Sequence, residues 1–227
     1  MRAQVIVIPG NETSELGFNR LLKSYQDTQQ EFSINSFDAS TPFTAEHEMK
    51  DFDITWNYPW EGQVSDFATG LIKRAYVGRD PKARIACAMS HFRLWAECYE
   101  TKETFLILEH DAYFIGEIPN ELYFNKCISL GKPSYGKWNQ ATSLGVNELF
   151  SKGYFPGAHA YIVKPGGAKE FIKQAKVFAR PTDVYLNKST FPWLQEYYPW
   201  PVEARDSFTT IQNVNGCYAK HNYGETY

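Results

Sequence analysis

The chain lacks the features that mark several common protein classes. Its 227 residues contain no apolar run of about 18 residues, the length that a membrane-spanning helix needs. The first residues run directly into a strand-like segment, so we expect no secretory leader. The four cysteines form no CxxC pair, which argues against a zinc knot. Free thiols in a reducing compartment are the simplest interpretation, and we expect a cytoplasmic protein.

Excess positive charge and several enzyme motifs are also missing. The 23 basic and 26 acidic residues give a formal net charge of −3, so we expect no nucleic-acid partner. The sequence has no G-x-S-x-G elbow, no G-x-x-x-x-G-K-[ST] loop, no G-x-G-x-x-G fingerprint and no H-E-x-x-H pair. It also has no internal repeat. These absences exclude the common serine-hydrolase, P-loop and zinc-protease patterns.

Aromatic residues, by contrast, are abundant. The chain has 16 Phe, 15 Tyr and 6 Trp, and 43% of its residues are hydrophobic. Most of these side chains are expected in a large core, although the same composition suits clefts for flat or ring-shaped ligands such as sugars.

The first part of the chain predicts a parallel α/β sheet. A short β-branched segment, residues 4–8, ends at Pro9-Gly10 and indicates a buried strand. Apolar residues at helical spacing follow from Phe18 to Tyr25, with Thr13 or Ser14 as the expected N-cap. Residues 32–37 predict a second strand. Strand–helix–strand order is typical of a parallel sheet.

The rest of the chain alternates ordered and irregular segments. Residues 40–80 predict a long excursion, either a lid or acceptor-side loop or a surface segment that packs its own aromatics. We expect short strands near Tyr135 and residues 141–144. The clearer elements are a helix over residues 82–99, strands over residues 104–108 and 158–163, and a helix from Pro165 whose apolar face extends to Phe178.

The triplet Glu109-His110-Asp111 is the main candidate for chemistry. It directly follows a five-residue apolar strand, and ligands of open α/β sheets bind beyond the carboxyl ends of the strands. Hard cations such as Mg²⁺ and Mn²⁺ prefer carboxylate oxygens and often share them with phosphates. We therefore expect Asp111 and Glu109 to bind a divalent metal and a diphosphate. Two acids that only cap the next turn are the structural alternative.

Three further residues are candidates, each with a structural alternative. His91 and Ser90 lie on the helix before the triplet, with Cys87 one turn before His91. A half-buried helix histidine and a serine bonded back into its helix are the plain alternatives. Asp183 follows Pro181 in a turn, where a carboxylate acts either as a general base or as a turn cap.

These segments together resemble glycosyltransferase family 25, which contains bacterial lipopolysaccharide glycosyltransferases and collagen galactosyltransferases. Residues 84–95 (RIACAMSHFRLW) are similar to the family's "E-I-G-C-x-x-S-H" helix, and residues 105–112 (FLILEHDA) to its "I-x-L-E-D-D-A" strand end. Residues 157–163 (GAHAYIV) with Pro181-Thr-Asp183 resemble its "G-T-x-A-Y-I" strand and "P-x-D". Residues 207–211 are similar to a family serine block. Three residues differ from these family motifs. His110 stands where the motif has its middle acid, Arg84 stands where it has an acid, and Ala158 stands where it has a threonine.

The resemblance implies an α/β, A-type glycosyltransferase fold with a Rossmann-like mixed sheet flanked by helices. It implies an inverting transfer of a sugar from a nucleotide sugar, usually a UDP-sugar, with Mn²⁺ or Mg²⁺. The acceptor would be a hydroxyl on a glycan, a lipid-linked molecule or a protein. It assigns the metal to Asp111 and Glu109, the donor pocket to Ser90, His91 and Glu109, and the catalytic base to Asp183.

We expect one domain over residues 1–227, with a nucleotide-sugar half (1–111) and an acceptor-side half (112–227). Asn11 and Arg20 are candidate donors to the diphosphate or uracil. Tyr161 and the aromatics of residues 191–201 are expected to stack on acceptor sugars. Two other functions stay open: an inactive nucleotide-sugar-binding module, favoured by His110, and a metal-dependent phosphoesterase.

Overall fold

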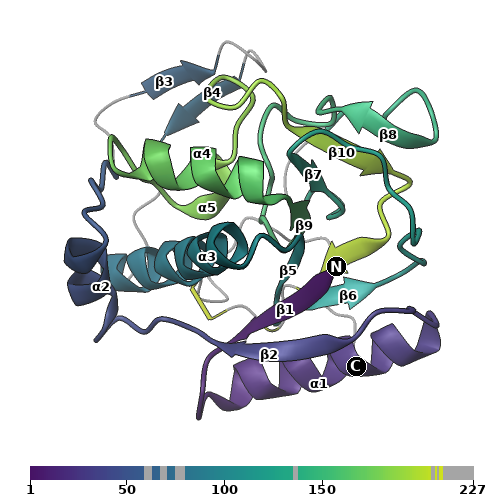
Figure 1. The fold of residues 1–227 in the computed structure, drawn as a ribbon, viewed down its shortest axis with the longest axis horizontal. Coiled ribbons are helices and arrows are strands. Elements are labelled where there is room, and N and C mark those ends of the chain that lie inside the picture. Colours follow the sequence, from purple (N-terminus) through teal and green to yellow (C-terminus); the bar gives the residue numbers. More distant parts are fainter. Residues whose placement is uncertain are drawn as a thin grey trace.

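A computed structural model describes residues 1–58, 63–66, 71–74, 80–134, 138–205, 208, 210 and 211. In this part of the chain a seven-stranded sheet has the order β2-β1-β5-β9-β7-β10-β8 (Figure 1). The strands are β1 (Arg2–Val7), β2 (Ile34–Asp38), β5 (Phe105–Glu109), β7 (Cys127–Ser129), β8 (Gly145–Glu148), β9 (Ala160–Val163) and β10 (Gln195–Tyr198).

The sheet is mixed. Strand β1 pairs in parallel with both β2 and β5, which confirms the parallel start expected from the sequence. Beyond β5 most pairings are antiparallel: β9 is antiparallel to β5 and β7, β10 is parallel to β7, and β8 is antiparallel to β10. Two small antiparallel pairs complete the strands, β6 (Ala112–Phe114) with β11 (Val202–Ala204) and β3 (Gln63–Asp66) with β4 (Leu71–Arg74).

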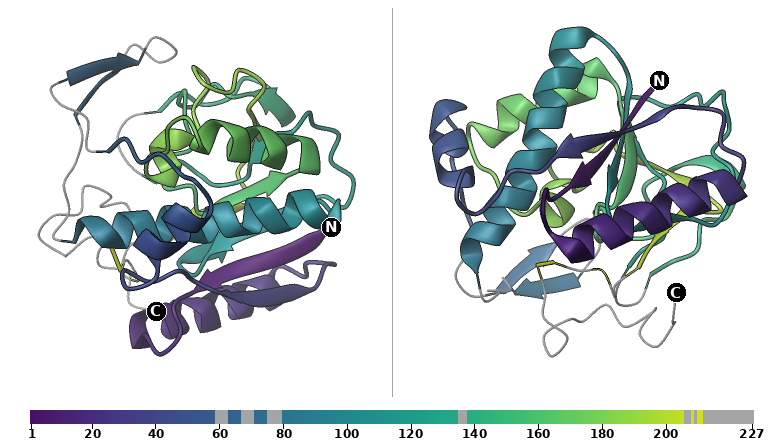
Figure 2. Two further views of the ribbon diagram at one scale, coloured as in Figure 1. Left: turned by 60° about the vertical axis from the view of Figure 1, so that its left-hand side comes forward. Right: turned by 90° about the horizontal axis from the view of Figure 1, so that it is seen from below.

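Helices cover both faces of the sheet (Figures 1 and 2). Helix α1 (Glu12–Asp27) lies on one face. Helices α3 (Pro81–Thr101) and α4 (Pro165–Ala175) lie on the other, with the short helices α2 (Ala45–Asp51) and α5 (Thr182–Tyr185) beside them. Because both faces are covered, the central strands are apolar throughout rather than alternating. In β5, Leu106 and Leu108 pack in the α1-side core, whereas Phe105 and Ile107 pack in the α3-side core.

Several element boundaries differ from the sequence expectations. Helix α1 begins at Glu12, and its N-cap is Asn11 rather than Thr13 or Ser14. The hydroxyl of Ser14 instead accepts a hydrogen bond from the amide of Ile8 at 2.9 Å, which ties the helix to the end of β1. Helix α4 ends at Ala175, so Phe178 lies beyond it. A left-handed turn at Gly157 and Ala158 delays β9 until Ala160.

The segments expected to be irregular contain more structure than predicted. Residues 40–80 include α2 and the β3–β4 pair, and residues 115–155 include β7 and β8. The strand expected near Tyr135 lies outside the described residues, and residues 141–144 precede β8 rather than forming a strand. All of these elements are short; β7 and β8 pair with strands elsewhere in the chain, whereas β3 and β4 pair with each other.

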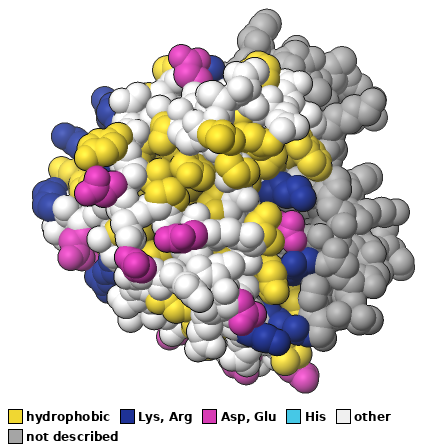
Figure 3. Space-filling model, turned by 90° about the vertical axis from the view of Figure 1, so that its right-hand side faces the viewer, with side chains coloured by type: hydrophobic (Ala, Val, Ile, Leu, Met, Phe, Trp, Pro, Cys, Tyr) yellow, Lys and Arg dark blue, Asp and Glu magenta, His cyan; other side chains and the backbone are white. Residues whose placement is uncertain are grey.

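Apolar side chains also reach the surface. Phe43, Tyr123 and Leu144 are 95%, 84% and 79% exposed. On the right-hand side of Figure 1, hydrophobic side chains gather in a band with acidic and basic groups around it (Figure 3). Among the described residues, no helix is both long and apolar enough to cross a membrane.

Candidate active site

A cavity of about 420 Å³ lies where the parallel strands β1, β2 and β5 end. This edge is the usual ligand site of an open α/β sheet. Its walls come from the segments after these strands, from α3 and from the end of the described chain. The lining residues are Ile6, Ile8, Asn11, Ala39, Ser40, Pro42, Asp80, Ala83, Ala86, Cys87, Ser90, Glu109, His110, Asp111, Thr210 and Ile211.

The expected acid triplet therefore lies at the cavity wall. Glu109 is the last residue of β5, and its amide donates to the carbonyl oxygen of His159 at 3.0 Å. The carbonyl oxygen of Asp111 accepts from the amide of Arg205 at 2.8 Å. Backbone hydrogen bonds on both sides thus fix the positions from which the two carboxylates extend.

Glu109 is oriented by a chain of buried side chains. The indole Nε1 of Trp95 donates to the Tyr161 hydroxyl oxygen at 2.8 Å, and that hydroxyl lies 2.8 Å from His91 Nδ1. His91 Nε2 lies 3.0 Å from Glu109 Oε1. Because Tyr161 already accepts from Trp95, its own proton is available to His91 Nδ1. A neutral His91 then carries its proton on Nε2 and donates it to Glu109.

These buried hydrogen bonds keep the Glu109 carboxyl ionised. Burial by itself raises the pKa of the carboxyl, but the hydrogen bond from His91 and the electrostatic interactions with His91, His110 and His159 outweigh burial and lower it. Tyr161 stays protonated, because burial raises the pKa of its hydroxyl well above the usual value. The expected stacking of Tyr161 on an acceptor sugar is wrong, since the ring is fully buried in the core.

Asp111 has a different environment. Burial and the neighbouring charge of Glu109 raise the pKa of its carboxyl to about 6. Its Oδ1 atom is buried and has no hydrogen-bond partner among the described residues. A buried carboxylate oxygen without a partner is costly unless something binds it. A cation at this position would satisfy the oxygen and favour ionised Asp111.

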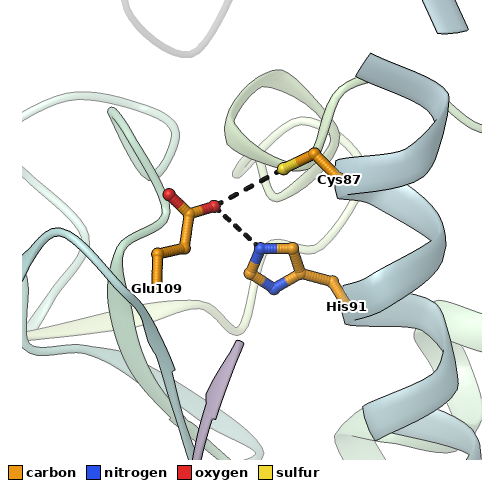
Figure 4. A group of neighbouring side chains, drawn as sticks. All are labelled: Cys87, His91 and Glu109. Carbon is orange, nitrogen blue, oxygen red and sulfur yellow. Dashed lines mark hydrogen bonds and ion pairs between the residues drawn. The ribbon is translucent and has the colours of Figure 1, made fainter. Parts of the chain in front are cut away.

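Cys87 is a third polar group at this point, and the sequence indicated it only through its spacing from His91. Its Sγ donates to Glu109 Oε1 at 3.5 Å. Figure 4 shows the thiol and the His91 ring both directed at the same Glu109 oxygen. Burial raises the pKa of this thiol well above its usual value, and the charges of Glu109, Asp183 and Asp111 raise it further.

Ser90 and His110 have structural contacts at the cavity. The Ser90 hydroxyl donates to the Ala86 carbonyl and accepts from the Ser40 amide, each at 2.9 Å, and so joins α3 to the segment after β2. His110 packs against Gly17 of α1, and its Nε2 lies 3.0 Å from the Phe208 carbonyl oxygen. His110 thus holds the segment that brings Thr210 and Ile211 to the cavity.

Asp183 lies in the first turn of α5, where its Oδ1 accepts from the Val184 amide at 2.9 Å. It is not among the described residues that line the cavity, although its charge is close enough to Cys87 to raise the pKa of the thiol. Asn11 does line the cavity, and its Oδ1 caps α1 by accepting from the Ser14 amide. Arg20 lies in α1 outside the lining residues.

Comparison with known proteins identifies the family. The sequence model for glycosyltransferase family 25 (LPS biosynthesis protein) matches residues 20–143, more than half of the chain. The matched region contains α3 and the Glu109-His110-Asp111 triplet but ends before Asp183. A search of curated proteins finds no match. On the family match, this chain belongs to glycosyltransferase family 25 and is a glycosyltransferase.

Proposed function

We propose that the enzyme transfers a sugar from a nucleotide sugar, most simply a UDP-sugar, to a hydroxyl of a glycan, lipid-linked or protein acceptor. One observation carries the proposal: ionised Glu109 and the unpartnered Oδ1 of Asp111 border one cavity at the carboxyl edge of the sheet. A mixed sheet with helices on both faces is consistent with the A-type glycosyltransferase fold that the family implies.

The donor set fits a hard divalent cation. Asp111 Oδ1 and the Glu109 carboxylate supply oxygen ligands, which Mg²⁺ and Mn²⁺ prefer, and two phosphates can complete the coordination. When bound, such a cation neutralises the charge that develops on the departing diphosphate. The protein contributes by holding Glu109 ionised through His91 and by fixing the Asp111 backbone through Arg205.

The cavity offers both apolar and acidic surroundings to a nucleotide. Ile6, Ile8, Ala39 and Pro42 provide an apolar wall, which suits a flat base and a ribose. Glu109 and Asp111 line the same cavity, and the diphosphate would lie against them. The sugar would then lie toward Asp111, with its anomeric carbon open to attack from the side opposite the diphosphate.

We propose Asp183 as the base in an inverting reaction. Its carboxylate would accept the proton of the acceptor hydroxyl as the oxygen attacks the anomeric carbon and the diphosphate leaves. Support comes from its position in the first turn of α5 and from its electrostatic proximity to Cys87, which contacts Glu109. The acceptor side is therefore expected between α5 and the end of β5.

The proposal is tested by calorimetric titration of UDP in the presence and absence of Mn²⁺. We expect Mn²⁺ to strengthen binding at least tenfold in the wild type and Asp111→Asn to abolish that gain, because the variant loses an anionic ligand oxygen. Asp51→Asn, an exposed acid on α2, is the matched control and should bind as the wild type does. Equal UDP affinity with and without Mn²⁺ in the wild type would refute the metal role.

Turnover separates the proposed transferase from the two other functions. With a UDP-sugar and Mn²⁺, a transferase releases UDP. A binding module binds UDP without any turnover. A phosphoesterase releases inorganic phosphate from UDP itself, even without a sugar.

A further inference from the structure

Three side chains of different chemistry meet at one point beside the cavity. A ligand atom from each of Cys87, His91 and Glu109 lies within 4.8 Å of the others. Glu109 Oε1 lies 3.0 Å from His91 Nε2 and 3.5 Å from Cys87 Sγ (Figure 4). Cys87 and His91 come from successive turns of α3, and Glu109 comes from the end of β5.

Cysteine sulfur, imidazole nitrogen and carboxylate oxygen are each ligands that zinc binds. With zinc bond lengths of about 2.3 Å to sulfur and about 2.0–2.2 Å to nitrogen and oxygen, a tetrahedral site separates its N and O ligands by about 3.4 Å and its S and O ligands by about 3.6 Å. The two observed contacts are therefore within a few tenths of an ångström of that geometry. A hard cation, by contrast, does not favour a thiolate.

The surroundings of the cluster also match a zinc site. A metal-bound histidine usually hydrogen-bonds through its other ring nitrogen, and His91 Nδ1 already contacts the Tyr161 hydroxyl, which Trp95 fixes in turn. Cys87 and Glu109 both line the cavity, so a fourth coordination position would be open to it. Sites with three protein ligands and an open position are the usual form of reactive zinc centres.

Charge favours a cation at this point. The carboxylates of Glu109, Asp183 and Asp111 all interact electrostatically with Cys87. Their negative potential disfavours a bare thiolate, and the same potential favours a divalent cation. Binding would replace the Cys87 thiol proton, which passes to solvent, and His91 would shift its proton from Nε2 to Nδ1. The imidazole would then donate to Tyr161, and the metal would replace the two hydrogen bonds now made to Glu109.

We propose that Cys87, His91 and Glu109 form a second metal site, which takes Zn²⁺ or another thiolate-seeking divalent cation and is distinct from the hard-cation site at Asp111. The site itself depends only on this geometry. The effect of this site on the enzyme depends on the proposed function. Because Glu109 belongs to both metal sites, Zn²⁺ bound here would weaken Mn²⁺-dependent UDP binding.

Cobalt titration tests the site directly. Co²⁺ replaces Zn²⁺ in tetrahedral sites and gives an intense thiolate-to-cobalt charge-transfer band in the near ultraviolet, which carboxylates alone do not give. We expect this band in the full-length protein at one Co²⁺ per chain, and we expect one equivalent of Zn²⁺ to remove it. Each sample carries Cys217→Ser, so that this cysteine, which lies outside the described residues, makes no contribution.

Variants identify the ligands. Cys87→Ser should lose the band, whereas Cys98→Ser, which removes another buried thiol of the same core, should keep it. Cys87→Ala provides a second replacement, and a cooperative urea unfolding transition followed by circular dichroism shows that either variant is folded. The site is refuted by absence of the band in the wild type or by its persistence in folded Cys87→Ser. Because no donor is present in the cobalt titration, its result is independent of the UDP experiment.

Discussion

At the scale of single residues, the hydroxyl of Tyr161 joins two buried side chains near the site. It accepts from Trp95 and faces His91, and both neighbours are buried. Tyr161→Phe leaves a buried indole N–H and an imidazole nitrogen without partners, which costs about 1–3 kcal/mol for each such group. We expect a lower free energy of unfolding in urea and a weaker gain in UDP affinity from Mn²⁺, because Glu109 loses its orientation.

Tyr185→Phe is the matched control for this prediction. Tyr185 is also buried, and its hydroxyl donates to the Phe171 carbonyl oxygen away from the cavity. The control should lose stability while its metal-dependent UDP affinity stays unchanged. If Tyr161→Phe behaves in the same way as the control, the hydroxyl only stabilises the core.

Asp183 is tested by separating binding from turnover. If it is the base, Asp183→Asn removes the proton acceptor, and kcat should fall by about 10²–10⁴-fold. UDP affinity, measured by calorimetry with Mn²⁺, should change less than about twofold. Equal losses in kcat and UDP affinity would instead assign Asp183 a binding or structural role.

The sequence predicted some site residues better than others for a physical reason. Glu109 ends a buried strand and Asp111 follows it, and the carboxyl ends of parallel strands meet at one sheet edge. The partners of Tyr161 are about 70 residues away along the chain, so no local pattern reveals them. The sequence therefore predicted the position of the two carboxylates at the sheet edge, but not the buried side chains that orient Glu109 or the contact between Cys87 and Glu109.

At the scale of secondary structure elements, Gly17 determines how closely α1 approaches the site. A Cβ atom at this position would lie 2.8 Å from the His110 carbonyl oxygen and 3.1 Å from the His110 ring. Alanine gains about 1 kcal/mol of helix propensity over glycine, but a backbone clash of this kind typically costs about 1–3 kcal/mol. We expect Gly17→Ala to lower the free energy of unfolding and to weaken Mn²⁺-dependent UDP binding, because α1 must move away from the triplet.

Gly166→Ala is the control for that substitution. Gly166 lies in the first turn of α4, and an added Cβ there would meet nothing within 4 Å. The same chemical change should therefore leave stability unchanged or raise it by up to about 1 kcal/mol. Both free energies come from urea titrations. A stable Gly17→Ala variant would show that the α1 contact with His110 is looser than the structure indicates.

The longer strands and helices were predictable because the pattern that defines each of them lies in its own residues. Strand β5 is apolar from Phe105 to Leu108 and β1 from Val5 to Val7, and α3 begins with Pro81 after Asp80, whose carboxylate caps the Lys82 amide. The three-residue strand β7 has no such pattern and is defined by its pairing with β9 and β10. The start of α1 was misplaced because Asn11 caps it directly after the Pro9-Gly10 turn.

At the scale of the whole molecule, the order of the strands bears on whether the chain is one folding unit. The expected halves meet inside the sheet, because β5 of the first half pairs with β9 of the second along four residues. The α3-side core also draws on both halves, since Trp95 contacts Phe171 and Tyr185. The sequence does not reveal this order, because antiparallel pairing between distant strands leaves no local trace.

We therefore expect residues 1–111 not to fold alone. Without β9 and α4, the fragment would expose one edge of β5 and the apolar side chains of α3, which bury against the second half. Exposed apolar surface of this kind removes much of the free energy that offsets chain entropy. In urea titrations followed by circular dichroism, the full chain should unfold in one cooperative transition and the fragment should show none. A cooperative transition in the fragment would mean that the nucleotide-sugar half is an independent domain.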